Sequence, residues 1–221
     1  MDGPGTITWE EFIKSAEDIV KLSNKISDHW QIVGNKEIPG QAYLARQEKI
    51  FVPVDYLADE PERGNRDECD DRRDEEWSEK LDTSTDPYEA FCAKERPLII
   101  EHHILWSMSY SVPVIYFNGW RSDFPGINAV SAESAQRLLA DAKLAYSELS
   151  QAIHPISGRP YLQLHPCGSR LLMLNAPNSA NKLVSWLSAI APAALNFRLR
   201  QEYYHLTIKS GEKFKGDTDC D

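Results

Sequence analysis

Cys167 is the side chain of this sequence that is best placed for chemistry. Residues 161–164 (Tyr-Leu-Gln-Leu) predict a short strand, and the segment His165-Pro166-Cys167-Gly168 predicts a sharp turn directly after it. A thiol in a loop that a rigid scaffold holds is placed as a nucleophile would be. An ordinary thiol is only a few per cent thiolate at neutral pH, which suffices for attack on an activated acyl group such as a thioester.

His165 can serve either the thiol or the turn. Pro166 disfavours helical backbone at His165, so His165 is expected to be extended and to lie on the same side of the chain as Cys167. There it either assists the thiol or hydrogen-bonds the backbone of the turn, and the spacing does not choose between these roles. A buried, unreactive Cys167 is the third interpretation, because most lone cysteines are small buried hydrophobes.

Two other kinds of site have less support. A cysteine hydrolase requires a base histidine and an orienting Asn or Asp, and no local motif selects one of His102, His103 and His154. A zinc site is disfavoured because the adjacent His102 and His103 point to opposite faces of a strand, and the cysteines form no CxxC pair. The sequence contains no glycine-rich phosphate loop. We therefore expect neither a metal nor a cofactor.

The elements that must position Cys167 begin with an amphipathic helix and two strands. Thr8 and Glu11 match a capping box, and apolar residues then recur at helical spacing as far as about Asp28. Residues 30–33 and 42–52 predict two short strands.

Residues 98–110 predict a half-buried strand, because apolar and polar residues alternate along it. The expected core face consists of Ile100, His102, Ile104, Trp106, Met108 and Tyr110, and most of the other face of Glu101, His103, Ser107 and Ser109. Residues 112–117 predict the next strand, after a bend at Ser111-Val112. A loop is expected from Asn118-Gly119 onward.

Two helices are expected in the C-terminal part of the chain. The first follows Ser131 and has apolar positions up to Leu149, and the second covers residues 179–190, just before Pro192. Consecutive strands joined by short turns form antiparallel sheets. The predicted fold class is therefore α+β, an antiparallel four-strand meander packed on helices at one side.

The chain of 221 residues predicts a single domain over residues 1–208 and a flexible tail over 209–221. Residues 58–92 predict an acidic, disordered insertion in that domain. Between residues 59 and 79 alone, eleven acidic residues and four arginines give a net charge of −7.

The overall charge of −10 argues against nucleic acid as a partner and against an anionic membrane surface. No apolar run approaches the roughly 20 residues of a membrane span. The N-terminus lacks the basic and apolar regions of a signal peptide. We therefore expect a cytoplasmic protein with reduced cysteines and no stable membrane insertion.

Three blocks of the sequence together resemble the autophagy ubiquitin-like conjugating enzymes, and within them the Atg-ten branch. They are residues 154–168 around the His-Pro-Cys triplet, residues 106–117 (Trp-Ser-Met-Ser-Tyr-Ser-Val-Pro-Val-Ile-Tyr-Phe) and residues 184–192 (Val-Ser-Trp-Leu-Ser-Ala-Ile-Ala-Pro). They occur in the family's order and span under half of the chain. The N-terminal half matches only in pattern, as a helix followed by two strands.

The resemblance implies a variant of the ubiquitin-conjugating-enzyme fold and an acyl-transfer reaction. The family accepts the C-terminal glycine of the ubiquitin-like modifier Atg-twelve from the activating enzyme Atg-seven, as a thioester on the cysteine that matches Cys167. It then transfers the acyl group to a lysine of the acceptor Atg-five.

One departure from ordinary ubiquitin-conjugating enzymes bears on the mechanism. Those enzymes carry an asparagine in a His-Pro-Asn motif before their cysteine, whereas here the cysteine itself follows His-Pro. Another group must therefore stabilise the oxyanion, and His165 and Tyr110 are the candidates. Tyr110 matches a family tyrosine near the thioester, and a packed aromatic residue with a bonded hydroxyl is the alternative interpretation.

Two alternative functions share the same fold. The sister branch Atg-three transfers its modifier to a lipid amine, but it is longer and begins with a membrane-sensing helix. The first helix here is instead acidic, with Glu10, Glu11, Glu17 and Asp18. A catalytically dead binding module is the other alternative, and the retained Cys167 disfavours it.

Overall fold

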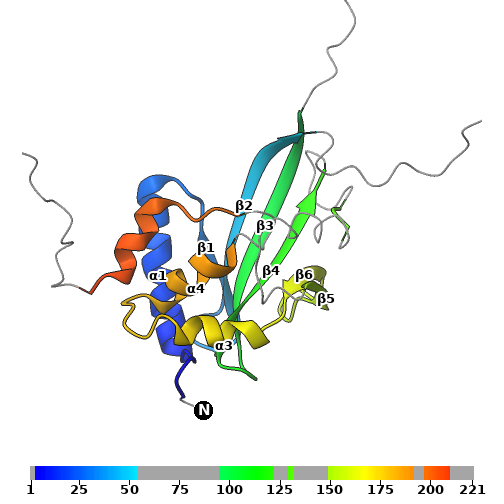
Figure 1. The fold of residues 1–221 in the computed structure, drawn as a ribbon. Coiled ribbons are helices and arrows are strands. Elements are labelled where there is room, and N and C mark those ends of the chain that lie inside the picture. The colour runs from blue at the N-terminus through cyan, green and yellow to red at the C-terminus, as the bar shows by residue number, and fades with distance from the viewer. Residues whose placement is uncertain (1–2, 54–94, 122–128, 132–148, 192–196, 210–221) are drawn as a thin grey trace, which may run out of the picture.

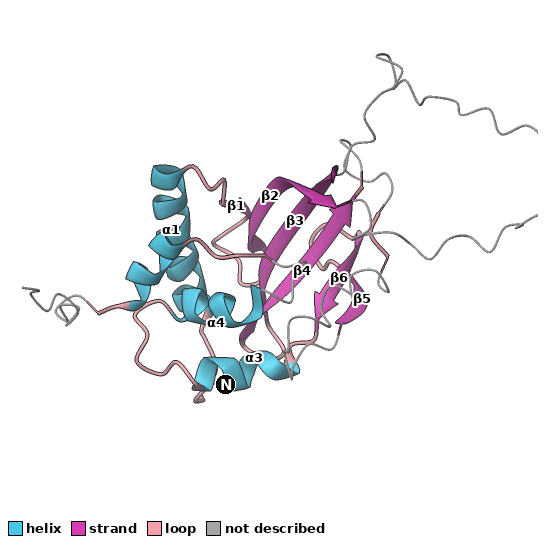
Figure 2. Cartoon of the chain, turned by 45° about the horizontal axis from the view of Figure 1, so that its top comes forward, coloured by secondary structure: helices cyan, strands magenta, loops and turns pink. Residues whose placement is uncertain are grey.

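The computed structural model describes residues 3–53, 95–121, 129–131, 149–191 and 197–209 (Figure 1). In these ranges, helices cover one face of an antiparallel sheet (Figure 2), which confirms the α+β class. The helices are α1 (Trp9–Ile26), α3 (Cys167–Leu174), α4 (Lys182–Ile190) and the 3-10 helix η3 (Gln201–Thr207). The strands are β1 (Gln31–Gly34), β2 (Ala42–Pro53), β3 (Glu95–Ser107), β4 (Val112–Trp120), β5 (Leu149–Ile153) and β6 (Pro160–Leu164).

The sheet has six strands in the order β1-β2-β3-β4-β6-β5, so it is larger than the expected four-strand meander. The separately predicted strand 161–164 is β6, which lies beside β4, and β5, which was not predicted, pairs with β6. The sequence did not predict β5 because apolar and polar residues do not alternate regularly over residues 149–153. The strand depends on its pairing with β6. Leu149, expected at the end of a helix, begins this strand, and the rest of that helix lies outside the described residues.

Helix α1 begins at the predicted capping box. The Glu11 amide donates to Thr8 Oγ1 at 3.2 Å, and the Thr8 amide donates to Glu11 Oε2 at 3.1 Å. The apolar stripe of the helix, with Phe12 and Ile19 fully buried, packs into the main core. Burial of each such side chain stabilises the fold by about 1.5–3 kcal/mol. The helix ends at Ile26, where Ser27 adopts a left-handed conformation.

Helix α4 is the predicted last helix, and it packs between α1 and α3. Asn181 caps it by accepting from the Val184 amide at 3.0 Å, and the Asn181 side chain also donates to Ser15 O of α1 at 3.1 Å. The fully buried Trp186 donates from Nε1 to Ser169 Oγ of α3 at 3.1 Å. Through these contacts α4 fixes α3, and hence Cys167, relative to the rest of the helical layer.

Strand β3 is buried on both faces, which corrects the prediction of a half-buried strand. Ile100 and Ile104 face the main core, but His103 and Leu105 on the other side are also only 4% exposed. The residues between β5 and β6 cover that second face, where the His154 ring lies 5.0 Å from the His103 ring. This cover comes from residues some fifty positions away, so the local alternation could not reveal it.

The end of the predicted strand 98–110 also differs from expectation. Met108 and Tyr110 lie in the turn after β3, where they are 68% and 52% exposed, rather than on a buried strand face. Strand β4 is longer than predicted, because Asn118 and Gly119 pair with β3 instead of starting a loop.

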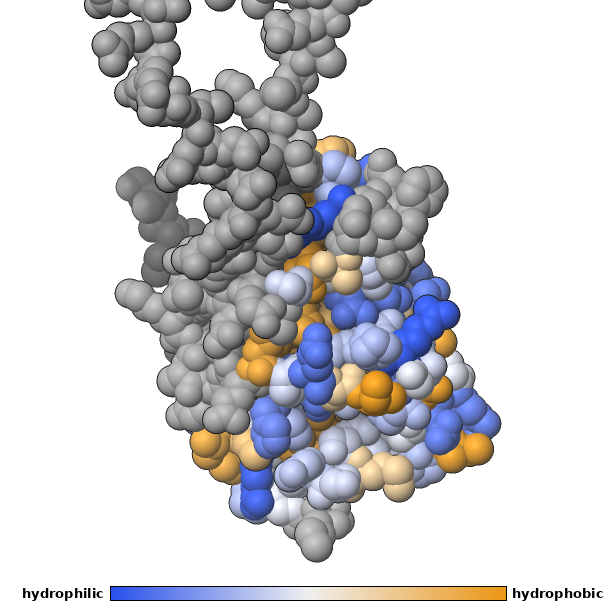
Figure 3. Space-filling model, turned by 90° about the vertical axis from the view of Figure 1, so that its right-hand side faces the viewer, coloured by the Kyte–Doolittle hydropathy of each residue, from blue (hydrophilic) through white to orange (hydrophobic). Residues whose placement is uncertain are grey.

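The predicted insertion at 58–92 lies outside the described residues, as does all of the predicted tail 209–221 except Lys209. Among the helices that the structure describes, none combines the length and the apolar character that crossing a bilayer requires. On the face drawn in Figure 3, apolar side chains are interspersed with hydrophilic ones and form no single broad patch.

Candidate active site

Cys167 is the first residue of α3 and follows β6 after only two residues. The segment 160–164 is held in the sheet by β4 and β5, so it delivers His165 and Pro166 in a defined direction. Pro166 caps the helix with φ −67°, a value that its ring imposes, and at this position the missing amide proton costs no helical hydrogen bond. The expected sharp turn is thus a helix start, and no local signal marked it because Pro166, the residue at the cap position, has no side chain that can cap the helix.

The thiol of Cys167 is free and exposed, which rules out a thiol buried in the core. Cys69, Cys92 and Cys220 lie outside the described residues. The loop interpretation of the sequence is therefore right about the accessibility of the sulfur, although the backbone around it is helical.

His165 contacts both the backbone and the side chain of Cys167. The Cys167 amide donates to His165 Nδ1 at 3.2 Å, and Cys167 Sγ lies 4.0 Å from His165 Nε2. An Nδ1 that accepts a hydrogen bond carries no proton, so in the neutral ring the proton is on Nε2. In this arrangement His165 points an N–H donor toward the sulfur. It can stabilise negative charge there but cannot remove the thiol proton.

The start of α3 supplies a second donor near the sulfur. The first amides of a helix have no partner within the helix. Here the Cys167 amide is used by His165 and the Ser169 amide by Pro166 O at 3.0 Å, whereas the Gly168 amide has no acceptor among the described residues. An amide in this position can donate to an oxyanion that forms at Cys167.

A pocket of about 460 Å³ opens beside Cys167. It is lined by three segments of the chain, namely Gly3 and Thr6, residues 109–112 and, from the start of α3, Pro166, Cys167 and Arg170. Tyr110 is one of the lining residues, and its hydroxyl has no hydrogen-bond partner among the described residues. The structure therefore brings together all three predicted site residues, Cys167, His165 and Tyr110.

The turn that carries Tyr110 is held in an uncommon conformation. Ser111 has φ 52°, in the left-handed region, and its amide donates to Ser107 O at 2.8 Å. The sequence indicated a bend here but contained no glycine or asparagine to signal it. The strained residue directly follows Tyr110 in the turn that lines the pocket.

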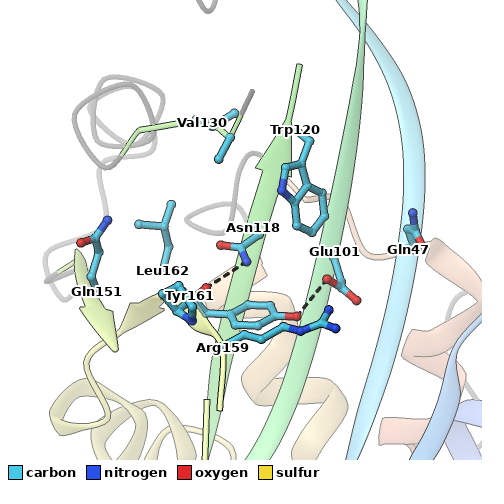
Figure 4. A pocket seen from close by; sticks show the side chains of 11 residues that line it. Gln47, Glu101, Asn118, Trp120, Val130, Gln151, Arg159, Tyr161 and Leu162 are labelled. Carbon is cyan, nitrogen blue, oxygen red and sulfur yellow. Dashed lines mark hydrogen bonds between the residues drawn. The ribbon is translucent and has the colours of Figure 1, made fainter. Parts of the chain in front are cut away.

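A larger hollow of about 520 Å³ lies between the end of β4, β3 and the β5–β6 hairpin. Figure 4 shows its wall, where Tyr161 donates to Glu101 at 2.9 Å and Asn118 donates to Pro160 O at 3.2 Å. Burial raises the pKa of Glu101, but hydrogen bonds from His103 and Tyr161 outweigh it and hold the pKa below its usual value. The lining residues include no Cys, Ser, Lys or His, and the Glu101 carboxylate and the Tyr161 hydroxyl are bonded to each other.

The three histidines that a hydrolase would draw on do not assemble around Cys167. His102 is buried in the main core, 4.8 Å from the Phe197 ring, whereas His103 and His154 are buried at the second face of the sheet. Within the described residues, no group of three or more His, Cys, Asp or Glu side chains could hold a metal ion. The exposed thiol with its neighbouring donors thus favours acyl transfer over hydrolysis.

Several residues of the site were not foreseen. Arg170 lies one turn after Cys167 on α3. Its helical spacing from Cys167 would have indicated that the two side chains lie on the same face, but only if the helix had been predicted. Gly3 and Thr6 reach the pocket from the opposite end of the sequence, and no local signal marks them.

Comparison with known proteins places this site in a family. The sequence model described as "Autophagocytosis associated protein, active-site domain" matches residues 11–198. The chain is 32% identical to the ubiquitin-like-conjugating enzyme ATG10 of Arabidopsis thaliana, over 41% of the chain and 46% of the relative. It is 31% identical to human ATG10 over 42% and 46%, and 30% identical to Dictyostelium discoideum ATG10 over 43% and 50%. The chain thus spans about half the length of the curated relatives it matches.

Proposed function

Because the chain belongs to the family of autophagocytosis-associated active-site domains, we propose that it is a ubiquitin-like-protein conjugating enzyme of autophagy with Cys167 as its nucleophile. The names of its relatives, ubiquitin-like-conjugating enzymes, support the reaction class. The observation that carries the assignment is the exposed sulfur at the start of α3, beside a pocket and two hydrogen-bond donors.

The reaction consists of two acyl transfers. Cys167 Sγ attacks the thioester that links the C-terminal glycine of Atg-twelve to the activating enzyme Atg-seven, and the thiol of Atg-seven leaves. An uncharged lysine amine of Atg-five then attacks the new thioester. The amide bond forms, the C–S bond to Cys167 breaks, and the amine proton passes to the sulfur or to solvent.

The groups around Cys167 have separate roles in this scheme. His165 donates from Nε2 toward the sulfur, and the Gly168 amide donates to the oxyanion of the tetrahedral intermediate. The Tyr110 hydroxyl borders the same pocket and is a third donor to the reacting centre. Aminolysis of a thioester is favourable, so the positioning of the lysine amine supplies most of the acceleration. The reaction takes place in the cytoplasm.

The test is the formation of a thioester on the full chain. The protein is incubated with Atg-seven, ATP and Atg-twelve, and the products are separated without reductant. We expect an adduct that thiols cleave, a thiol-resistant oxyester for Cys167→Ser, and no adduct for Cys167→Ala. Cys92→Ala, which leaves Cys167 in place, serves as the control and should form the normal adduct.

Two results would count against the proposal. If active partners yield no thiol-sensitive adduct on the native chain, Cys167 is not an acceptor. If Atg-twelve still becomes linked to Atg-five when Cys167→Ala replaces the native chain, the protein is a binding module. Transfer to a lipid amine in place of Atg-five would assign it to the Atg-three type.

A further inference from the structure

We infer that residues 3–7, which precede α1 and which we call the N-terminal strap, position the modifier's C-terminal tail beside Cys167. The inference rests on the proposed function and deepens it. The strap contributes Gly3 and Thr6 to the lining of the pocket that contains Cys167. The first described residues of the chain run beside α3 (Figure 2).

The strap has a defined shape because it closes on itself. The Gly3 amide donates to Thr6 Oγ1 at 3.2 Å, Thr6 Oγ1 donates to Gly3 O at 2.6 Å, and the Thr6 amide donates to Gly3 O at 3.2 Å. The Thr6 side chain thus holds the part of the strap that borders the pocket.

The strap is also fixed to the turn that carries Tyr110. The Ile7 amide donates to Ser111 O at 2.8 Å, and Trp106 Nε1 donates to Ile7 O at 2.8 Å. Ile7 itself is 1% exposed and anchors the strap in the core. A displacement of the strap would therefore remove a backbone partner from the Tyr110 turn.

The strap contacts α3 so closely that only glycine fits at position 5. Gly5 has φ +82°, and a Cβ there would lie 2.7 Å from Arg170 O and 2.7 Å from Leu174 Cγ. Arg170 is a lining residue of the same pocket. Gly5 therefore lets the strap touch the helix that begins with Cys167. The strap thus contacts both other segments that line the pocket, the Tyr110 turn and the start of α3.

The lining of this pocket suits a peptide tail that ends in glycine. Its volume of about 460 Å³ lies within the range of about 300–1,000 Å³ that is usual for ligand pockets. The walls carry the hydroxyl residues Ser109 and Ser111, which can bond the amides and carbonyls of an extended chain. No carboxylate lies among the lining residues, so this pocket does not attract the ammonium group of a lysine. The tail, rather than the acceptor side chain, is the occupant we assign.

The decisive variant is Gly5→Ala, because the added Cβ must push the strap away from the Arg170 carbonyl. Gly158→Ala is the matched control. Gly158 has a similar φ of +67°, but nothing lies within 4 Å of the added Cβ. Thr6→Val is a milder second variant, since it keeps the shape of the side chain and removes the bonds to Gly3.

Two rates are measured on each full-length variant: single-turnover loading with Atg-twelve from Atg-seven, and alkylation of Cys167 by iodoacetamide. We expect Gly5→Ala to load at least tenfold more slowly than Gly158→Ala, and Thr6→Val several-fold more slowly than the native chain. The alkylation rate should stay unchanged in every variant, because a small electrophile does not use the strap. A merely structural role of the strap would change the alkylation rate as well, because a loosened α3 alters the surroundings of the Cys167 thiol.

The outcomes separate this inference from the proposed function. If the native chain loads and both strap variants load equally fast, the strap does not position the tail. If the alkylation rate of a strap variant differs from that of the native chain while loading slows, the defect lies in Cys167 or α3 and the inference is again wrong. If the native chain itself forms no adduct, the proposed function fails, and the strap loses its role with it.

Discussion

The pair His165 and Cys167 shows how a residue's role depends on which of its atoms are already occupied. The Cys167 amide occupies His165 Nδ1, so the ring presents a donor, not a base, to the sulfur. A donor at this position helps most when negative charge builds up on the sulfur or the oxyanion. In the proposed transfer to a lysine, Cys167 Sγ is the leaving group and gains negative charge, whereas in loading it is the attacking atom and loses charge, so we expect the histidine to matter most in the transfer step.

We therefore expect His165→Ala and Tyr110→Phe to slow transfer to Atg-five by up to about 100-fold, with a smaller effect on thioester formation. The two steps can be measured separately by single-turnover loading and by discharge of the purified thioester. Tyr204→Phe is the control, because Tyr204 is also exposed but belongs to η3. Equal slowing of loading and discharge would remove the assigned roles of His165 and Tyr110.

At the scale of elements, the β5–β6 hairpin depends on an uncharged histidine. His154 Nδ1 accepts from the amides of Ile156 and Ser157 at 3.2 and 3.0 Å, which closes the turn that covers the second face of the sheet. Burial, together with the nearby His103, lowers the pKa of His154 to about 4. A protonated ring would lose the Nδ1 acceptor and place a charge among aromatic side chains.

The sign of the pH dependence follows from this shift. The pKa of His154 is lower in the folded state than its ordinary value of 6.5, so acid favours the unfolded state. The stabilisation is complete above about pH 6.5 and is lost as the pH falls toward 4. Between pH 7.5 and pH 5 the free energy of unfolding should decrease by about 2 kcal/mol because of this residue.

Urea unfolding at both pH values measures this decrease. His154→Asn should remove it, since the asparagine oxygen can accept the same two amides without titrating. It should also lower stability at pH 7.5 because the shorter side chain leaves a gap. His205→Asn, at an exposed position, should keep the native decrease. If His154→Asn shows the same decrease as the native chain, His154 is not the titrating group.

At the scale of the whole molecule, Asp28 joins the helical layer to the sheet. Its carboxylate is almost fully buried and accepts from Arg46 Nη2 of β2 at 2.9 Å, Arg200 Nε at 2.9 Å and the Tyr203 hydroxyl of η3 at 2.8 Å. Three segments far apart in the sequence thus meet at one side chain. Each of these groups needs the others, because an unpaired charge buried at this position would lower the free energy of unfolding by several kcal/mol.

Asp28→Asn should therefore destabilise the protein by about 3–5 kcal/mol, since the buried Arg46 loses its buried ionic partner and keeps only the half-exposed Glu48. The free energy of unfolding in urea measures the loss. Asp18→Asn removes a solvent-exposed ion pair with Lys21 on α1, and it should change the free energy of unfolding by less than about 0.5 kcal/mol. Similar effects of both substitutions would show that the Asp28 contacts contribute little.

The elements that the sequence predicted correctly are those with local signals. Helix α1 has its capping box at Thr8 and a repeating apolar stripe, and α4 has its own stripe around Trp186. Strand β6 was predicted because the residues that flank it mark its ends. The position of Cys167 after a strand followed from the same local pattern, its exposure came from the structure, and its catalytic role remains a prediction.

Features that join residues far apart in the sequence depend on the tertiary structure. The pairing of β5 with β6, the burial of His103 under His154 and the contact of Gly5 with Arg170 all depend on segments that no local period connects. The direction in which His165 donates also follows from the packing of its turn, not from its spacing to Cys167. Apolar periodicity and helix capping are local signals that act over one or two turns of chain, so the sequence was enough to place Cys167 after a strand. Burial and hydrogen-bond partners are set by whatever folds against a residue, so the surroundings of Cys167 became known only with the fold.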